Sequence, residues 1–364
     1  MTRKNTFILI TILVLIFIVF YGNHLLQTKK SSATNSKSSE KTQIYDKDFD
    51  VNVNLPYKEI SSYAAYKDNV YMSAADNSPS GMANKIIQYN RKTNKVETLF
   101  TTKFDSSSIQ GLKANDNWVT WVDSDDFGDQ KNIYIMNTKT REIEPITKEN
   151  DKSIKNEFPV LADNYLAWIY FDQNKNQSYV MIRDLKTHRN KTVFNLKTHT
   201  LDNAFLSVQD GKILFTDIRE GKSYCYLYNI STHKLEEFQS PHKKIGWGEL
   251  LNDHQIVYLA FFTESFADNK LVLFDTQTKK ANEFSSKYME VNGLRVDGSN
   301  HVFVGTGVSN HFQKYQIDNG NIKKIGEIED NDIFDMTANN GVYLMKIETK
   351  NKEEKLIITS KLPE

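Results

Sequence analysis

Short apolar runs that alternate with polar residues recur along most of the chain, and turns rich in Asn, Asp and Gly separate them. Alternation with a period of two is typical of half-buried β-strands, whereas an amphipathic helix repeats every 3.6 residues. Turns of the form Asn/Asp-x-x-Thr follow such runs and begin at Asn90, Asn137, Asp184, Asn229 and Asp275. These copies begin 47, 47, 45 and 46 residues apart, and a weaker copy begins 43 residues later at Asp318. The pattern predicts a repeated all-β unit.

A second marker has the same period. A polar turn that leads into a β-branched or aromatic run occurs seven times, with runs beginning at Val70, Trp118, Tyr165, Lys212, Gln255, His301 and Gly341. Each unit therefore holds about four short strands, and a four-stranded sheet cannot bury both faces alone. Units of about 40–50 residues are typical of β-propellers, whereas β-sandwiches need about 100 residues. We predict a β-propeller of seven four-stranded blades, with six blades as the alternative count.

The two ends of the repeat region predict how the ring closes. The last unit ends in the strand KLIITSK at residues 355–361 and lacks an outer fourth strand. Residues 49–56, FDVNVNLP, form an alternating strand with no partner nearby in the sequence. Pairing these two segments removes two open sheet edges. We therefore expect the N-terminal strand to close the last blade.

An apolar segment precedes the repeats. Residues 7–21 read FILITILVLIFIVFY and follow Arg3 and Lys4, which favour a cytoplasmic N-terminus. Fifteen helical residues span about 22 Å, so residues 22–26 must extend the helix across a hydrocarbon core of ~30 Å. No small-residue cleavage signal follows, and the one cysteine, Cys225, is too distant for lipid attachment. We predict one uncleaved transmembrane helix that acts as a signal-anchor.

These segments divide the chain into three parts. Residues 1–26 are the predicted anchor, residues 27–44 a stalk and residues 45–364 the propeller domain. The stalk is rich in Ser and Lys and has too few apolar residues to offset the entropy cost of ordering. The expected location is the cell membrane, with a single span and the propeller on the extracytoplasmic side.

Charge and cysteine content exclude several classes of function. The 46 basic residues balance 46 acidic residues, and the lysines are scattered, so no nucleic-acid-binding surface is expected. A single cysteine excludes an intrachain disulfide and a cysteine-based zinc site. The G-x-S-x-G motif of propeller-linked hydrolases is also missing from the sequence. No cofactor is expected.

Residues 123–168 resemble the TolB-type propeller repeat, which runs from an Asp/Gly-rich turn through an I-Y-x-M-[ND] strand to a Thr and then a Pro. The matching positions are Ser124, Asp125, Gly128, Ile133, Tyr134, Met136, Asn137, Ile146, Thr147 and Pro159. The resemblance covers about two units well and the others as a looser pattern. It implies a propeller of a binding kind, although TolB-like proteins have six blades and an additional α/β domain.

Aromatic residues are the candidate binding groups. The candidates are Trp247, which lies between two glycines, and Tyr170, Phe171, Phe261 and Phe262, which lie where second strands run into loops. Exposed rings give a peptide or glycan partner a large contact area. Packing between blades is the alternative role for each ring.

Acidic residues suggest two further kinds of site. Asp123, Asp125 and Asp129 share one loop that begins like an EF-hand, but Tyr134 stands where the closing Glu is required. Only a weak cation site is therefore expected there, and no resident metal. Asp172, Asp217 and Glu264 follow second strands and are candidates for paired catalytic carboxylates. The histidines fall mostly in turns and are expected at the surface.

The sequence favours a membrane-anchored, non-enzymatic scaffold at the cell envelope that binds an envelope protein or a cell-wall ligand. The alternative is a carbohydrate-active hydrolase or lyase that uses carboxylates on one face of the propeller.

Overall fold

The computed structural model describes the all-β part of the chain. It covers residues 51–53, 55, 57, 59–76, 81–125, 128–147, 152–198, 205–261, 269–284, 291–296, 301–306, 311–318, 320–329, 333–339, 342–348 and 354–359. All of these belong to the second of two compact units, Lys47–Glu364. No helix with the length and apolarity of a membrane span occurs within the described ranges. The predicted anchor and stalk lie outside them.

The described strands form four-stranded antiparallel sheets, and six of these consist of strands consecutive in the chain. The first three sheets are β2 (Glu59–Tyr66), β3 (Asn69–Ala75), β4 (Lys85–Asn90), β5 (Lys95–Thr101); β6 (Ser107–Ala114), β7 (Trp118–Asp125), β8 (Lys131–Asn137), β9 (Ile143–Pro145); and β10 (Ile154–Ala162), β11 (Tyr165–Asp172), β12 (Gln177–Asp184), β13 (Arg189–Leu196). The next three are β14 (Leu206–Gln209), β15 (Lys212–Arg219), β16 (Lys222–Asn229), β17 (Leu235–Gln239); β18 (Lys244–Leu250), β19 (Gln255–Phe261), β20 (Asn269–Asp275), β21 (Lys280–Phe284); and β22 (Val291–Val296), β23 (His301–Thr306), β24 (His311–Asp318), β25 (Asn321–Glu329). The last sheet combines β26 (Ile333–Asn339), β27 (Val342–Glu348) and β28 (Glu354–Thr359) with β1 (Val51–Val53).

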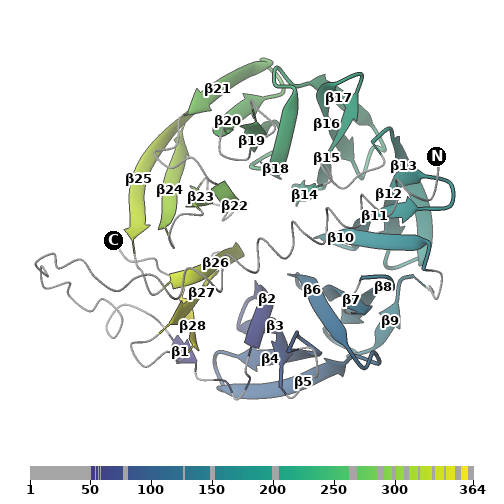
Figure 1. Cartoon of the computed structure of the whole chain (residues 1–364), viewed down its shortest axis with the longest axis vertical. Coiled ribbons are helices and arrows are strands. Elements are labelled where there is room, and N and C mark those ends of the chain that lie inside the picture. The colour runs from purple at the N-terminus through teal and green to yellow at the C-terminus, as the bar shows by residue number, and fades with distance from the viewer. Residues whose placement is uncertain are drawn as a thin grey trace, which may run out of the picture. The chain divides into compact units, whose positions relative to one another are not determined.

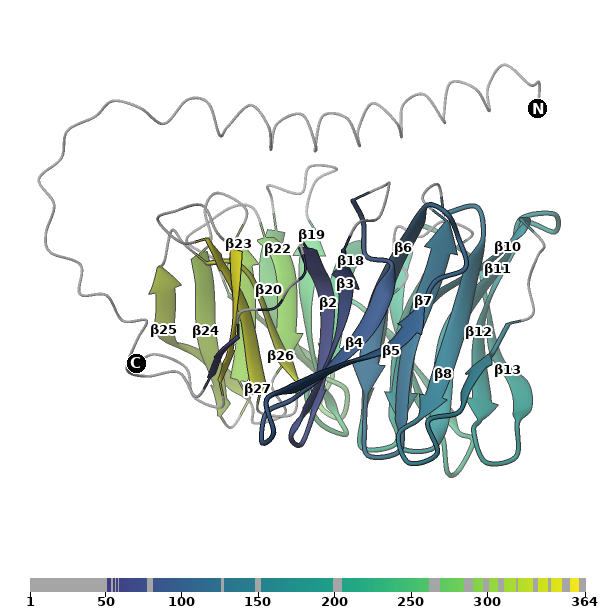
Figure 2. The same cartoon turned by 90° about the horizontal axis from the view of Figure 1, so that it is seen from below.

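The sheets of this unit are arranged in a ring. In the six sheets of consecutive strands the first strand lies nearest the axis and the last lies at the periphery, and in the closing sheet β26 lies nearest the axis and β1 at the periphery (Figure 1). The inner strands contact one another in succession, and β26 contacts β2. Seen from the side, the strands cross the thickness of the ring (Figure 2). The predicted all-β class is confirmed.

The N-terminal strand completes the last sheet, as predicted. β1 pairs antiparallel with β28, with Val51 opposite Ile358 and Val53 opposite Leu356. Leu356 and Ile358 pack in one cluster with buried residues of the first sheet, and Leu55 packs against that cluster. The two ends of the unit are therefore held together by backbone pairing and by apolar packing.

The Asn/Asp-x-x-Thr turns connect the third and fourth strands of their sheets. In each turn the side-chain oxygen of the first residue accepts the backbone N–H of the Thr over 2.7–3.1 Å. This Asx bond replaces a ladder bond and so ends the strand. The residue after each Thr has a φ of +56° to +64°; these residues are Asn94, Arg141, His188, His233 and Lys279.

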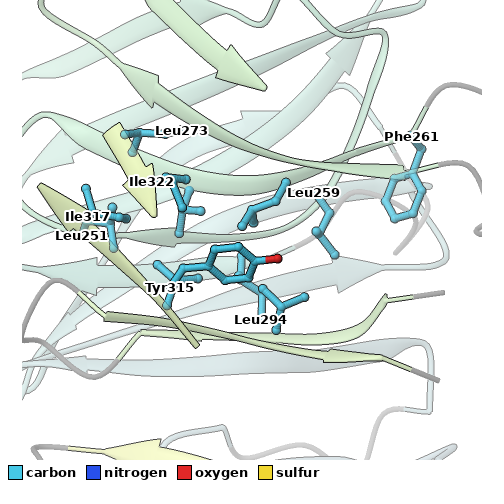
Figure 3. Packing of buried hydrophobic residues seen from close by; sticks show 12 residues of the cluster. Leu251, Leu259, Phe261, Leu273, Leu294, Tyr315, Ile317 and Ile322 are labelled. Carbon is cyan, nitrogen blue, oxygen red and sulfur yellow. The ribbon is translucent and has the colours of Figure 1, made fainter. Parts of the chain in front are cut away.

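The core is built from the second strands. The fourth residue of each second strand is no more than 2 % exposed; these residues are Met72, Trp121, Trp168, Phe215, Tyr258, Val304 and Met345. Neighbouring sheets share apolar clusters, as Figure 3 shows for Leu259 and Phe261 of one sheet and Leu294 and Tyr315 of the next. A sheet buried on both faces needs such a neighbour on each side, which explains why the repeat forms a ring.

Candidate functional site

The inner strands carry a recurring irregularity. In six of the described sheets the register between the inner strand and its neighbour shifts at a bulge. We call the residues that the pairing skips the inner-strand bulges: Ser61, 111–112, 158–159, Trp247, Asn292 and Phe334. Bulges re-aim side chains and are common next to binding and active sites. The bulges of β10 and β18 both lie opposite the middle of the second strand, between the partners Ala167 and Ile169 and between Tyr258 and Leu259.

Trp247 is the bulge residue of β18. Its side chain is 41 % exposed, and its φ is +42°. A bulky residue at positive φ is a conformational outlier that costs about 1–3 kcal/mol, and such strain is concentrated at functional sites. The Trp247 ring meets the Phe261 ring edge to face, with centroids 6.2 Å apart.

The two glycines beside Trp247 leave room for aromatic rings. A Cβ on Gly246 would lie 2.5 Å from Phe261 Cε2, and a Cβ on Gly248 would lie 2.3 Å from Phe205 Cζ. The Gly-Trp-Gly sequence therefore lets Phe205 and Phe261 pack directly on the strand on either side of Trp247. The result is a compact aromatic group on one inner strand.

Gly246→Ala is expected to lower the free energy of unfolding by about 1–3 kcal/mol, because the added methyl group overpacks the site against the buried Phe261 ring. Chemical denaturation measures this loss. Gly326→Ala is the matched control, since among the described residues beyond its chain neighbours no atom lies within 4 Å of its Cβ position. Equal stability changes in the two variants would contradict the packing described for Gly246.

Phe158 is the corresponding residue of β10. It is 40 % exposed, has a φ of +55° and precedes Pro159, whose ring packs 3.7 Å from the Cβ position of Gly111. The other described non-glycine residues with positive φ all lie in turns between strands. Phe158 and Trp247 thus share three features: a position inside an inner strand, a left-handed backbone and an exposed aromatic ring.

The sequence matches no known family profile and no curated protein. Its structure resembles the β-propeller domain of the trilobed protease from Pyrococcus furiosus, with a TM-score of 0.51, 15 % identity, and coverage of 70 % of this chain and 82 % of that chain. The fold is a β-propeller. An oligogalacturonate lyase in complex with manganese has a TM-score of 0.54, 13 % identity, and coverage of 82 % and 86 %. TolB from Acinetobacter baumannii has a TM-score of 0.46, 10 % identity, and coverage of 84 % and 79 %. At these identities the likeness concerns the propeller fold alone.

The propeller brings only some of the predicted aromatic residues together. Trp247 and Phe261 are in contact, but Phe261 is only 5 % exposed and packs between blades. Tyr170 and Phe171 are half-buried, and the Tyr170 ring lies 6.0 Å from the Tyr179 ring. Phe262 lies outside the described residues. Phe158 was not among the predicted residues, although the sequence EFPV places an aromatic residue before a proline inside the first strand of its unit.

Asp123 and Asp217, two of the predicted carboxylates, each bind the segment that connects the preceding blade to their own blade. The Thr102 hydroxyl, which follows the outer strand β5, donates to Asp123 over 2.8 Å. In the same way Asp217 accepts the backbone N–H of Lys197 over 2.8 Å and that of Thr198 over 2.9 Å. Both aspartates are buried. These hydrogen bonds give Asp123 and Asp217 a structural role at the crossing between blades.

Asp172 is held locally. Its carboxylate pairs with the Lys175 ammonium at 2.8 Å and accepts the Lys175 N–H at 3.0 Å. These interactions lower the pKa of Asp172 from its ordinary value. Glu264, the third candidate of this set, lies outside the described residues. The described carboxylates at the ends of second strands are therefore engaged with their own surroundings.

The acidic loop forms a turn. Asp125 Oδ1 accepts the backbone N–H of Asp129 over 2.6 Å and that of Gln130 over 3.2 Å. Asp129 is exposed, whereas Asp123 is directed to Thr102. Within the described ranges no group of three or more His, Cys, Asp or Glu side chains is arranged to hold a metal ion.

His242 corrects one expectation, because it is buried and not at the surface. Its Nδ1 lies 2.9 Å from the Tyr258 hydroxyl, and its Nε2 lies 3.0 Å from Glu283 Oε1. The Lys270 ammonium and His242 lower the pKa of Glu283. His242 lies in the connection from β17 to β18, which leads from one blade to the next. A segment there can be buried even though its residues are typical of a turn.

Asp123→Asn is expected to stabilise the protein at neutral pH. Burial raises the pKa of Asp123 from 3.8 to about 6, so the folded state binds the proton more tightly than the unfolded state does. The free energy of unfolding therefore falls as the pH rises through this interval, by about 1–3 kcal/mol. The asparagine variant lacks this fall, while its Oδ1 can still accept the Thr102 hydroxyl. Denaturation at pH values across the interval measures the gain, which should vanish near the unfolded pKa of 3.8; a gain independent of pH would contradict the assignment.

Proposed function

We propose that this chain is a seven-bladed, extracytoplasmic β-propeller that binds a ligand on its inner strands and acts as a scaffold rather than an enzyme. The observation that carries the proposal is the pair Phe158 and Trp247. Each ring is exposed on an inner-strand bulge in a backbone conformation that destabilises the fold. An exposed ring contributes little burial free energy and so does not offset the backbone strain. Binding of a ligand to the two rings would account for both their exposure and the strained backbone.

The proposed location is the cell membrane. Residues 1–26 would anchor the protein, and residues 27–44 would form a stalk that sets the reach of the propeller. The apolar run at residues 7–21 and the basic residues before it support an outward-facing propeller domain at residues 45–364. The partner would be an envelope protein or a cell-wall ligand.

The alternative of a carbohydrate-active hydrolase or lyase has less support. Such chemistry uses two carboxylates that face a common substrate. Asp172 and Asp217, the two candidate catalytic carboxylates that the structure describes, instead bond to the chain around them. The likeness to an oligogalacturonate lyase concerns the fold and does not carry a set of catalytic residues to this chain.

Photo-cross-linking in the native cell tests the binding proposal. p-Benzoylphenylalanine is placed in the full-length protein at position 247 or 158, and, as a control, at Ile325, which is 40 % exposed on the outer strand β25. We expect the same cross-linked product from positions 158 and 247 and none from position 325. No product from the two inner positions, or an equal yield from all three, would contradict binding on the inner strands.

A further inference from the structure

We propose that the ligand of the inner strands is an uncharged carbohydrate chain, whose sugar rings stack on Trp247 and Phe158. This inference rests on the proposed function and names the chemistry of the ligand. Three observations carry it: the charged side chains beside the two rings, the interrupted strand edges and the form of the aromatic surface.

The charged side chains of β18, the strand that carries Trp247, balance. On β18 the residues that reach solvent are Lys244, Gly246, Trp247 and Glu249, and the remaining residues are buried. The strand thus presents one positive and one negative side chain. Glu249 Oε2 also accepts the Ser207 hydroxyl over 2.8 Å. The charges of the strand itself therefore favour neither an anion nor a cation, whereas the partly exposed Glu249 carboxylate can accept a neutral hydroxyl group.

The charged side chains beside Phe158 are already engaged within the protein. Glu157 pairs with Lys131 at 2.6 Å, and both side chains are largely buried. The Lys155 ammonium donates to the carbonyl oxygens of Gly128 at 3.0 Å and Asp129 at 2.7 Å. A charged ligand at Phe158 would therefore have to compete with interactions already formed inside the protein. An uncharged ligand leaves them intact.

The interrupted strand edges disfavour an extended peptide. A peptide that adds to a sheet needs a continuous row of backbone groups at the strand edge. On β10 the regular pairing with β11 is interrupted between Glu157 and Val160, and on β18 the pairing with β19 is interrupted between Gly246 and Gly248. Few consecutive residues on either side of the bulge remain for a peptide to pair with.

The aromatic surface suits a sugar ring. The face of an aromatic ring is negatively polarised and attracts the C–H groups on one face of a pyranose, while the hydroxyl groups at the pyranose edge bond to polar neighbours. Trp247 supplies such a ring beside Glu249, and Phe261 supports it from the edge. The positive φ of Trp247 fixes the direction in which its ring projects, so the platform is formed before the ligand arrives.

Calorimetric titration of the full-length protein, in a detergent without a sugar head group, tests the inference. The probes are chitotetraose and cellotetraose, which are uncharged, and tetragalacturonate, which is anionic. We expect millimolar or tighter binding of at least one uncharged probe, and at least about tenfold weaker binding of tetragalacturonate. Binding of the uncharged probe should change by less than about twofold between 50 and 500 mM salt, because no ion pair forms.

Variants locate the binding. Trp247→Ala should weaken binding of the uncharged probe by about tenfold or more, Phe158→Ala by a few fold, and Trp247→Phe by less than about threefold because a ring remains. Ile325→Ala, at an equally exposed apolar residue of an outer strand, should leave binding unchanged. Normal binding by Trp247→Ala, or equal binding of the anionic probe, would overturn the inference.

Two outcomes separate this inference from the proposed function. If neither uncharged probe binds and position 247 cross-links to a protein, the carbohydrate inference is overturned and binding on the inner strands stands. If neither probe binds and no product forms from positions 158 and 247, both fail.

Discussion

Deletion of residues 45–56 is expected to lower the midpoint of thermal unfolding by about 5–10 °C. The deletion removes β1, so the edge of β28 loses its pairing at Leu356, Ile357 and Ile358. It also removes Leu55, which packs against the cluster shared by the first and last blades. A loss of a few kcal/mol lowers the midpoint by about 2 °C per kcal/mol in a protein of this size. The open edge should also promote association between molecules.

Differential scanning calorimetry of the full-length protein and the deletion variant measures this effect. Deletion of residues 30–41, which removes an equally long part of the predicted stalk, is the control and should leave the midpoint unchanged. Equal midpoints for the two deletion variants would show that β1 does not hold the ring closed.

Trp168→Ala is expected to lower the free energy of unfolding by about 3–5 kcal/mol, a large share of the stability of an ordinary domain. Trp168 is 2 % exposed and packs in one cluster with Val122 and Ile133 of the preceding blade. Its indole N–H also donates to Asn156 Oδ1 over 3.1 Å, so the truncation removes the partner of a fully buried amide. Chemical denaturation monitored by far-UV circular dichroism measures the loss.

Trp247→Ala is the matched comparison for Trp168→Ala, because it removes the same side chain from an exposed position. Its cost should stay below about 1.5 kcal/mol, since much of the ring is already in solvent. Similar losses in the two variants would place Trp247 in the core and remove it as a binding group.

The propeller architecture could be predicted from the sequence because it depends on local turn residues and on the period of the apolar runs. The Asx turns at Asn90 and its equivalents form with the predicted spacing. The N-terminal strand β1, which has no partner nearby in the sequence, pairs with the last strand β28, as the alternation of its apolar residues indicated. The Asx turns depend on residues that are neighbours in the chain, and the pairing of β1 depends on the need to cover an open sheet edge. Neither depends on details of side-chain packing.

The binding residues were harder to predict because their exposure depends on the backbone. Phe158 and Phe261 both occur in strands with apolar neighbours, but a bulge turns Phe158 into solvent while regular pairing holds Phe261 between blades. Composition does not distinguish these two cases. The burial of His242 also depends on the three-dimensional structure. Its segment has the composition of an ordinary turn, but it lies in the connection between two blades and is enclosed there.

The strain at Trp247 can be separated from its packing by comparing glycine with alanine. Glycine adopts a positive φ without penalty, so Trp247→Gly should be more stable than Trp247→Ala by about 1 kcal/mol. Each of these variants lacks the indole ring, and we expect neither to bind.

The most direct test combines Trp247→Gly with the photo-cross-linker at position 158 in the full-length protein. If Phe158 and Trp247 serve one ligand, the yield of the product from position 158 should fall at least severalfold while the midpoint of thermal unfolding stays at or above that of Trp247→Ala. An unchanged yield from position 158 would contradict a shared binding site on the inner strands.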